Sequence, residues 1–288
     1  MADYGCVVLI EAVAKDFLTA TVSEFSSIYP PWDDYAARLT AAGENPGDLT
    51  ADSMSLQLSG PFGKPALDAV PLLPLIQSVA TELLGPAAVL LQSHLWMKYG
   101  HLGKSFELPL HSDFMNHTFL YPSDDPRFQV IHGIVYYSDV TLDDGPTYIV
   151  PREVSRTEWL VPLFKRRAQL PYLYDNEIPV TVPAGSILLY TSKLLHRASL
   201  MRDEQRQRLT HFFAYGPPDV SWLGWGRWLC SQPGLARQAF IERCGAAALR
   251  RSGFPDPASP YWTQETIEGT SLMYPGLALD DYLRARSG

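Results

Sequence analysis

The sequence QVIHGIVYYSDVTLDDGPTYIVP, at residues 129–151, decides the fold. Its two ends, residues 129–138 and 146–151, are rich in β-branched and aromatic side chains, which favour extended structure. Between them lies the sequence Asp-Asp-Gly-Pro at residues 143–146, a strong turn signal. The stretch therefore predicts two short strands joined by a turn.

The same alternation of β-rich runs and turns extends over a much longer stretch, from about residue 87 to residue 216. The further runs are residues 87–99, 178–182, 186–191 and 207–215. Many short strands separated by turn residues predict a barrel or jelly roll. We therefore expect a mainly β fold with flanking helices.

Helical patterns lie on both sides of this β-rich region. Residues 11–27, 66–84 and 234–251 carry apolar side chains at helical spacing, whereas residues 254–288 are rich in Pro and aromatic residues. With no clear linker, one domain is expected. Its parts are a helical N-terminal part (1–86), a jelly-roll core (87–216) and a helical or irregular C-terminal cap (217–288).

Composition narrows the classes of protein. The 288 residues are 46% hydrophobic and carry a formal charge of −8, without the basic stripe that nucleic-acid binders show. No apolar run reaches the roughly 20 residues of a membrane span. Three cysteines make no disulfide framework, and no basic segment precedes an apolar run at the N-terminus. We expect a cytoplasmic protein with neither a nucleic-acid nor a membrane partner.

One short motif has the spacing of a metal site. In an extended segment, side chains at positions i and i+2 point to the same face, so His111 and Asp113 can bind one ion together. A second histidine from another strand would complete two imidazoles and one carboxylate. That set leaves coordination positions open and is typical of non-haem Fe(II) oxygenases.

His196 is the best third ligand, because it follows the turn at Gly185 and an apolar run from a distant part of the chain. Arg208 lies twelve residues further on and begins a β-rich run. If Arg208 faces inward, alternation turns His211 outward and excludes it as a ligand. A buried, forked guanidinium suits a carboxylate held by two parallel hydrogen bonds.

The chain resembles the phytanoyl-CoA dioxygenase (PhyH)-like family of Fe(II)/2-oxoglutarate-dependent oxygenases over most of its length. The resemblance rests on residues 3–9 before a helix, on residues 137–151, on residues 185–196 leading to the distal histidine, and on Lys98. It implies a double-stranded β-helix (jelly-roll, cupin-like) core. It also implies Fe(II), with 2-oxoglutarate and O2 as co-substrates, and oxidation of a second molecule with release of succinate and CO2.

Two departures from the family pattern affect the expected site. Arg152 follows Val-Pro where the family continues with Gly-Ser-His, and Ala198 stands where a hydroxyl often helps the arginine bind 2-oxoglutarate. The resemblance therefore makes Arg208, Ser199 and Lys98 the candidate co-substrate residues. The retained Asp113 disfavours halogenation, for which related enzymes replace this carboxylate.

Four residues are candidates for contact with the substrate, which we expect to be a small, partly apolar organic molecule, such as one of secondary metabolism. Phe114 and Asn116 follow the metal motif, and His132 and Tyr136 share one face of a predicted strand. His132 is also compatible with a core position. The cations of residues 152–167 keep an acidic or CoA-linked substrate open, and no pattern indicates the oligomeric state.

Two other functions compete with hydroxylation by such an oxygenase. A cupin-like metal-dependent isomerase or dioxygenase would use the same ligands without a keto acid, but it leaves Arg208 unexplained. A catalytically inactive jelly-roll binding module is disfavoured by the intact His111, Asp113, His196 and Arg208. Metal-dependent binding of 2-oxoglutarate separates the three.

Overall fold

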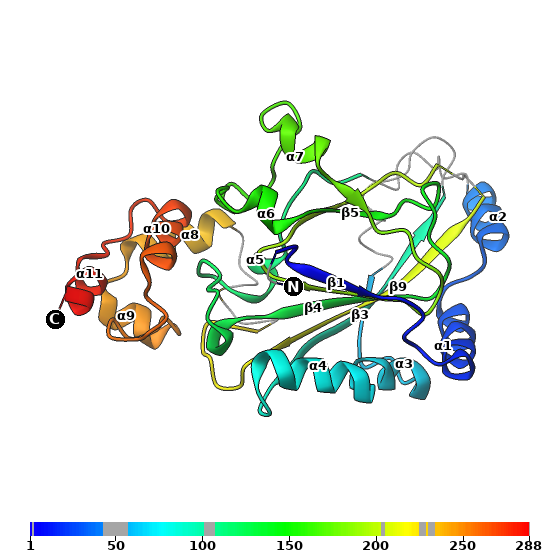
Figure 1. Cartoon of the computed structure of the whole chain (residues 1–288), viewed down its shortest axis with the longest axis horizontal. Helices are drawn as coiled ribbons and strands as arrows, with labels where there is room; N and C mark the ends of the chain where they lie inside the picture. The colour runs from blue at the N-terminus through cyan, green and yellow to red at the C-terminus, as the bar shows by residue number, and fades with distance from the viewer. Residues whose placement is uncertain are drawn as a thin grey trace.

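The protein is built around two antiparallel sheets, as the computed structural model in Figure 1 shows. The structure describes all residues except 2, 43–56, 101–106, 203–204, 225–228, 230–233 and 288. The strands are β1 (Cys6–Leu9), β2 (Gln57–Ser59), β3 (Val89–Tyr99), β4 (Ile131–Tyr136), β5 (Thr147–Val150), β6 (Ile178–Pro179), β7 (Ile187–Thr191), β8 (Leu195–Ala198) and β9 (Gln207–Gly216). The larger sheet has the order β1-β7-β4-β9-β3-β2 and the smaller one β6-β5-β8. The expected mainly β fold with flanking helices is confirmed.

Alternation along the strands gives the larger sheet two different faces. On its outer face, Leu95 and Met97 of β3 belong to a hydrophobic cluster shared with the N-terminal helices. On its inner face, the register places Phe212 of β9 beside both His94 of β3 and Ile134 of β4. The inner face turns toward the smaller sheet, and there the cluster of Ile134 also includes Ile149 of β5.

Helices cover the outer face of the larger sheet (Figure 1). They are α1 (Lys15–Ile28), α2 (Trp32–Ala42), α3 (Pro65–Ala69), a 3-10 turn η2 (Val70–Leu72) and α4 (Pro74–Leu84). The single helix expected over residues 66–84 is therefore three pieces, because prolines stand at the first turn of both η2 and α4.

The stretch 65–84 is also long and apolar enough to span a membrane by length and composition. In the fold, however, Leu67, Val70, Ile76 and Ala80 pack into the cluster beneath the larger sheet. Packing against the core explains why this stretch is apolar. Only 28% of an 18-residue apolar segment within it is buried, however.

Four helices form the C-terminal cap at one end of the sheets (Figure 1). They are α8 (Gly234–Arg243), α9 (Ala246–Arg251), α10 (Gln264–Met273) and α11 (Asp280–Ser287). The expected helix over 234–251 breaks near Gly245, and the irregular structure expected after residue 254 is wrong in part. Helix α10 begins there because the Thr263 hydroxyl accepts a hydrogen bond from the Thr266 amide, and the Thr266 hydroxyl accepts one from the Thr263 amide.

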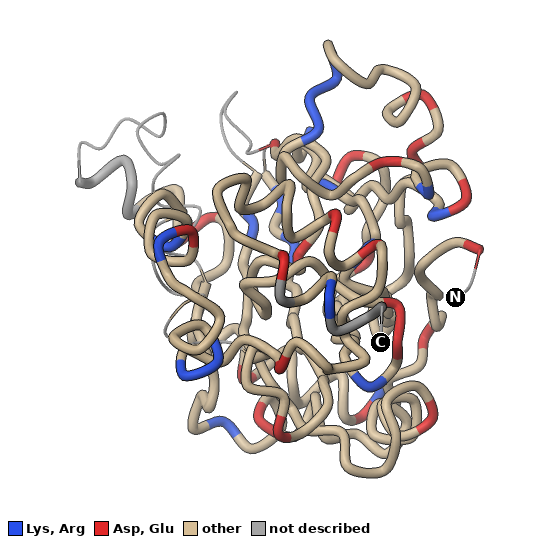
Figure 2. The backbone as a smooth tube through the Cα atoms, turned by 90° about the vertical axis from the view of Figure 1, so that its left-hand side faces the viewer, with Lys and Arg blue, Asp and Glu red and all other residues tan. Residues whose placement is uncertain are grey.

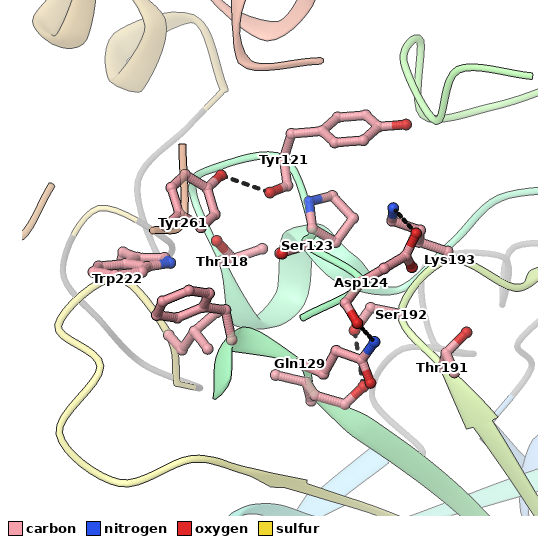
Figure 3. A pocket seen from close by; sticks show the side chains of 14 residues that line it. Thr118, Tyr121, Ser123, Asp124, Gln129, Thr191, Ser192, Lys193, Trp222 and Tyr261 are labelled. Atoms are coloured by element: carbon pink, nitrogen blue, oxygen red, sulfur yellow. Dashed lines mark hydrogen bonds and ion pairs between the residues drawn. The ribbon is translucent and has the colours of Figure 1, made fainter. Parts of the chain in front are cut away.

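The cap is joined to the sheets by a hydrophobic cluster and by buried polar contacts, which Figure 3 shows from close by. The Tyr261 hydroxyl donates to the Tyr121 carbonyl at 2.6 Å, and buried Lys193 pairs with Asp124 at 2.8 Å and with Glu265 of α10 at 2.6 Å. The cavity between them measures only about 10 Å³, room for no more than a water molecule. This region is therefore a packed junction.

Two features of the connections differ from the sequence prediction. Strand β8 was not expected, although His196 lies on it. Short helices also interrupt the loops: α5 (Phe114–His117), η3 (Pro126–Phe128), α6 (Arg152–Ser155) and α7 (Pro171–Asp175). The stretch 43–64 is rich in Gly, Pro, Ser and Asp, which predicts a loop, and residues 43–56 of it lie outside the described residues.

Charged residues of both signs are scattered along the backbone, as Figure 2 shows for the described part of the chain. Arginine and lysine positions alternate with acidic ones over the face in view, without a continuous basic track. This distribution agrees with the net charge of −8. The absence of a nucleic-acid partner nevertheless stays a prediction.

Candidate active site

A cavity of about 320 Å³ lies between the two sheets. Its walls come from the inner face of the larger sheet, from β8 of the smaller one, and from the segments around residues 111–116 and 163–164. The cavity contains His111, Asp113 and His196, together with Arg208. The structure thus brings the expected metal ligands and the expected arginine into one space.

The three expected ligands converge because the backbone pairs their segments directly. The amide of His111 donates to the His196 carbonyl at 2.9 Å, and the amide of His196 returns a hydrogen bond at 2.8 Å. Asp113 then stands at the start of α5, two residues beyond His111. One ligand atom from each side chain lies within 4.8 Å of the other two.

The hydrogen bonds of both imidazoles leave the correct nitrogen facing this centre. The Nδ1 atom of His111 lies 2.9 Å from the Pro109 carbonyl, and that of His196 lies 3.2 Å from the Leu194 carbonyl. A carbonyl only accepts, so each Nδ1 carries the proton and each Nε2 is left with a lone pair when the ring is neutral. The Nε2 atoms lie 3.8 Å and 3.2 Å from the two oxygens of Asp113.

Burial and proximity set the charges of these groups. Burial lowers the pKa of His111 to about 4, and the neighbouring His196 acts in the same direction. Burial alone would lower the pKa of His196 as well, but Asp113 raises it above the ordinary value. Although burial opposes ionisation of Asp113, His196 and His111 hold its pKa well below its usual range. The site therefore presents an ionised carboxylate to any cation.

Tyr190 of β7 is a further residue at this centre, and it was not among the expected site residues. Its hydroxyl donates to Oδ2 of Asp113 at 2.7 Å, and its ring stacks on His132 with centroids 5.0 Å apart. Burial raises the pKa of the Tyr190 phenol well above 10, and Asp113 adds to the effect, so the phenol stays a hydrogen-bond donor. Its only signal in the sequence is a polar-tipped aromatic residue at an inward position of an apolar strand.

The opposite end of the cavity is cationic. Arg208 of β9 and Lys98 of β3 are direct neighbours in the sheet register, and both are buried. Arg208 donates through Nη1 to the Gly145 carbonyl, while its buried Nε has no hydrogen-bond partner among the described residues. Burial lowers the pKa of Lys98 well below its ordinary value, and Arg208 lowers it further. An anion placed here would relieve the repulsion between the two side chains.

Two expected co-substrate residues point elsewhere. His196 and Ala198 share one face of β8, and both line the cavity. Ser199 follows Ala198 and does not line the cavity. The Ser199 hydroxyl donates to the Pro146 carbonyl at 2.6 Å, and the Ser199 carbonyl accepts from the Lys98 ammonium. Lys98 is thus held beside Arg208 without lining the cavity itself.

The expected substrate residues divide into two pairs. Asn116 and His132 line the cavity. Phe114 instead packs in a separate hydrophobic cluster with Leu110 and Tyr121, and Tyr136 donates to the Thr147 hydroxyl beneath the cavity wall. His132 is also a core residue, since its Nε2 lies 2.9 Å from the Ser192 hydroxyl and the side chain is buried. His132 is therefore both a core residue and a residue of the cavity wall.

Other side chains complete the walls of the cavity, and the sequence did not single them out as a group. They are Gln92, His94 and Trp96 of β3, Phe212 of β9, and Leu163 and Phe164 from the 152–177 segment. His211 lies on the other face of β9, as alternation predicts, and contacts Ser93 and Tyr137 there. The sequence also groups Trp222, Trp225 and Trp228, a cluster that favours packing over recognition. Trp222 is buried in the cluster of the cap, and Trp225 and Trp228 lie outside the described residues.

The donor atoms fit a bound iron and a keto acid. Two neutral imidazole nitrogens and one carboxylate form the facial set that leaves positions open on iron. Arg208 and Ser112 line the cavity, and among the described residues the Arg208 Nε and the Ser112 Oγ have no hydrogen-bond partner. The buried guanidinium of Arg208 is a cation that suits the carboxylate of a keto acid.

Known proteins share both the sequence family and the fold. The profile of the phytanoyl-CoA dioxygenase (PhyH) family matches residues 2–208. HygX from Streptomyces hygroscopicus, with nickel and 2-oxoglutarate bound, is 17% identical with a TM-score of 0.55, over 77% of this chain and 85% of its own. EctD from S. alaskensis, with 2-oxoglutarate and 5-hydroxyectoine, is 22% identical with a TM-score of 0.54, over 76% and 74%.

A third solved structure, the carbocyclase SnoK from nogalamycin biosynthesis, is 16% identical with a TM-score of 0.56, over 82% of this chain and 87% of its own. At these identities the structures establish the shared fold. No curated protein matches the sequence. The profile covers well over half of the chain, so the protein belongs to the phytanoyl-CoA dioxygenase (PhyH) family of Fe(II)/2-oxoglutarate-dependent oxygenases.

Proposed function

We propose that His111, Asp113 and His196 hold Fe(II), and that the protein uses 2-oxoglutarate and O2 to hydroxylate a small organic molecule. The observation that carries this proposal is the pair of Nδ1 hydrogen bonds to backbone carbonyls. Those bonds fix both imidazoles with Nε2 toward one carboxylate, which is the arrangement that a metal requires of its ligands.

Arg208 binds the distal carboxylate of 2-oxoglutarate in this proposal. Its guanidinium is buried at the end of the cavity, and a forked cation matches a carboxylate with two parallel hydrogen bonds. Lys98 lies beside Arg208 and adds positive potential, whereas Ser199 contributes by holding the Lys98 ammonium through its carbonyl. The keto-acid end then lies toward the metal ligands at the other side of the same cavity.

The remaining walls favour an uncharged substrate with a ring. Apart from Asp113 and Arg208, the described residues that line the cavity carry no carboxylate, lysine or arginine. Burial lowers the pKa of both His94 and His132 to about 4, so both imidazoles are neutral. Trp96 and Phe212 supply apolar ring faces, and Asn116 supplies an amide. A cavity of about 320 Å³ is small for two ligands, so the substrate is small or extends outward.

The chain's own residues bind, orient and shield the reactants. Bound Fe(II) supplies the oxidative chemistry, in which 2-oxoglutarate loses CO2 to give succinate and one oxygen atom enters the substrate. Arg208 fixes the position and direction of the keto acid by binding its distal carboxylate. Phe164 lies against His111, with ring centroids 5.9 Å apart, and excludes water from that side. Hydroxylation needs no acid or base beyond these groups.

The biological setting is inferred from the same features. A small aromatic-lined cavity suits a molecule of secondary metabolism, and SnoK, which shares the fold, comes from nogalamycin biosynthesis. The few cysteines fit a reducing compartment, so the proposed location is the cytoplasm. A single domain of 1–288 is consistent with the hydrophobic cluster that joins the cap to the sheet through Val130, just before β4, and Ala214 of β9.

The proposal is tested by substrate-free turnover of 2-oxoglutarate. The purified protein with Fe(II), ascorbate and O2 is expected to release succinate slowly, and His111→Ala and Asp113→Ala to release none above the background without protein. Arg127→Ala, which removes an exposed side chain outside the cavity, serves as the control. Succinate release by the ligand variants at the wild-type rate would refute the metal assignment. Tight metal binding without any succinate would favour the cupin-like alternative.

A further inference from the structure

The carboxylate of Asp113 is held by a residue that the family resemblance did not assign. Tyr190 lies on β7, the strand that pairs with β4 on one side and with β1 on the other. Its hydroxyl donates to Oδ2 of Asp113 at 2.7 Å, a short bond to a charged acceptor. We infer that Tyr190 is a positioning residue, which fixes the orientation of the Asp113 carboxylate for metal binding. This inference rests on the proposed function.

The Tyr190 ring cannot easily turn away from this contact. The side chain is buried, and it belongs to the hydrophobic cluster between the two sheets. On one face it stacks on His132, with ring planes 18° apart, and its edge meets His196 with centroids 5.1 Å apart. His132 is in turn fixed by the Ser192 hydroxyl at 2.9 Å. The hydroxyl of Tyr190 is therefore aimed at Asp113 by packing on several sides.

Asp113 needs such a support because its own backbone setting is weak. It stands at the start of α5, which is only four residues long, and it makes no side-chain cap of that helix. Among the described residues, the one hydrogen bond to its other oxygen is a long one of 3.3 Å from Asn116, a residue that is exposed. The two histidines, by contrast, are fixed by carbonyl contacts and by mutual backbone pairing. Tyr190 therefore orients the Asp113 carboxylate, as the backbone carbonyls orient the two imidazoles.

The consequence is measurable at the metal and not only in turnover. Tyr190→Phe keeps the ring and its stacking but removes the hydroxyl. Loss of a residue that orients a metal ligand typically weakens metal binding about 10–100-fold. In addition, a carboxylate that no longer shares electron density with a phenol donates more to Fe(II). The charge-transfer band of the anaerobic Fe(II)–2-oxoglutarate complex is then expected at longer wavelength.

Tyr137→Phe is the matched control. Tyr137 is a buried tyrosine on the outer face of the same sheet, and its hydroxyl lies 2.8 Å from Nδ1 of His211. Both variants lose one buried hydrogen bond and both are expected to lower the unfolding midpoint. Only Tyr190→Phe is expected to change the metal site, so a general loss of stability is separated from a loss of positioning.

The experiment measures Mn(II) binding by the electron paramagnetic resonance of free Mn(II), for the wild type, Tyr190→Phe, Tyr137→Phe and His196→Ala. We expect a Kd raised at least tenfold in Tyr190→Phe and unchanged within twofold in Tyr137→Phe. A Tyr190→Phe Kd within twofold of wild type, or a band at the wild-type wavelength, overturns the inference alone. If the wild type binds no Mn(II), or His196→Ala binds it equally well, the proposed function fails as well.

Discussion

Replacement of Arg208 by alanine tests how the co-substrate is held. Arg208 is 5% exposed and lines the cavity, and its Nη1 donates to the Gly145 carbonyl. A hydrogen bond to a charged group contributes about 1.5–3 kcal/mol, and truncating one partner of a buried charged pair costs about 2–5 kcal/mol. A loss of about 3 kcal/mol corresponds to a rise of roughly a hundredfold in the KM for 2-oxoglutarate.

The assay is succinate formation at saturating Fe(II), with 2-oxoglutarate varied over three orders of magnitude. Because Arg208 binds the end of the keto acid that does not react, Arg208→Ala is expected to raise KM far more than it lowers kcat. Arg208→Lys keeps the charge but loses the fork, so an intermediate rise is expected.

Arg206→Ala is the control, because Arg206 lies just outside β9, is 45% exposed at its side chain, and pairs with Asp144 at 3.0 Å. It should leave the KM for 2-oxoglutarate within about twofold, because Arg206 is not among the residues that line the cavity. An unchanged KM in Arg208→Ala, or an equal rise in Arg206→Ala, would refute the reasoning.

Three further predictions concern pH, packing and thiol chemistry. Metal must displace the proton that Asp113 stabilises on His196, whose pKa is raised, so Mn(II) affinity should fall about tenfold per pH unit as pH drops below that pKa. Calorimetry that finds a pH-independent affinity would contradict this. Gly133→Ala places a Cβ 2.1 Å from Phe213, so urea unfolding should show a loss of about 1–3 kcal/mol, and an unchanged midpoint would count against the packing. Burial raises the pKa of Cys6 from 9.0 to about 11, so its alkylation by iodoacetamide at pH 8 should be about a hundredfold slower than in the unfolded chain. Mass spectrometry of the Cys6 peptide measures both rates, and equal rates would disprove the effect of burial.

The grouping of the site was predictable from local geometry and spacing. The spacing of two residues predicted that His111 and Asp113 act together, and the structure brings them together with His196, although Asp113 stands at the start of α5 and not in a strand. Alternation along β9 separated Arg208, which lines the cavity, from His211, which lies on the other face of the strand. That second inference rests on the period of two residues in a regular strand.

Other features could not be read because tertiary contacts decide them. Strand β8 is only four residues long and includes Arg197, whose charge is balanced by Glu177 from another segment. Because the sequence did not predict this strand, it did not show which way the side chain of Ser199 points. Helix α10 contains Gly269, which normally weakens a helix, but a Cβ there would lie 2.2 Å from the Tyr121 ring. The close approach of the core to the cap therefore requires a glycine that the sequence alone reads as a break.

The most direct test of the central claim is anaerobic titration of the metal-free protein with Fe(II) and 2-oxoglutarate, followed by visible absorbance and calorimetry. We expect stoichiometric binding of 2-oxoglutarate only when metal is present, with a weak visible charge-transfer band, and loss of both in Asp113→Ala. Tight binding of Fe(II) without any binding of 2-oxoglutarate would contradict the account, and would leave the PhyH family relationship as one of fold without the co-substrate chemistry.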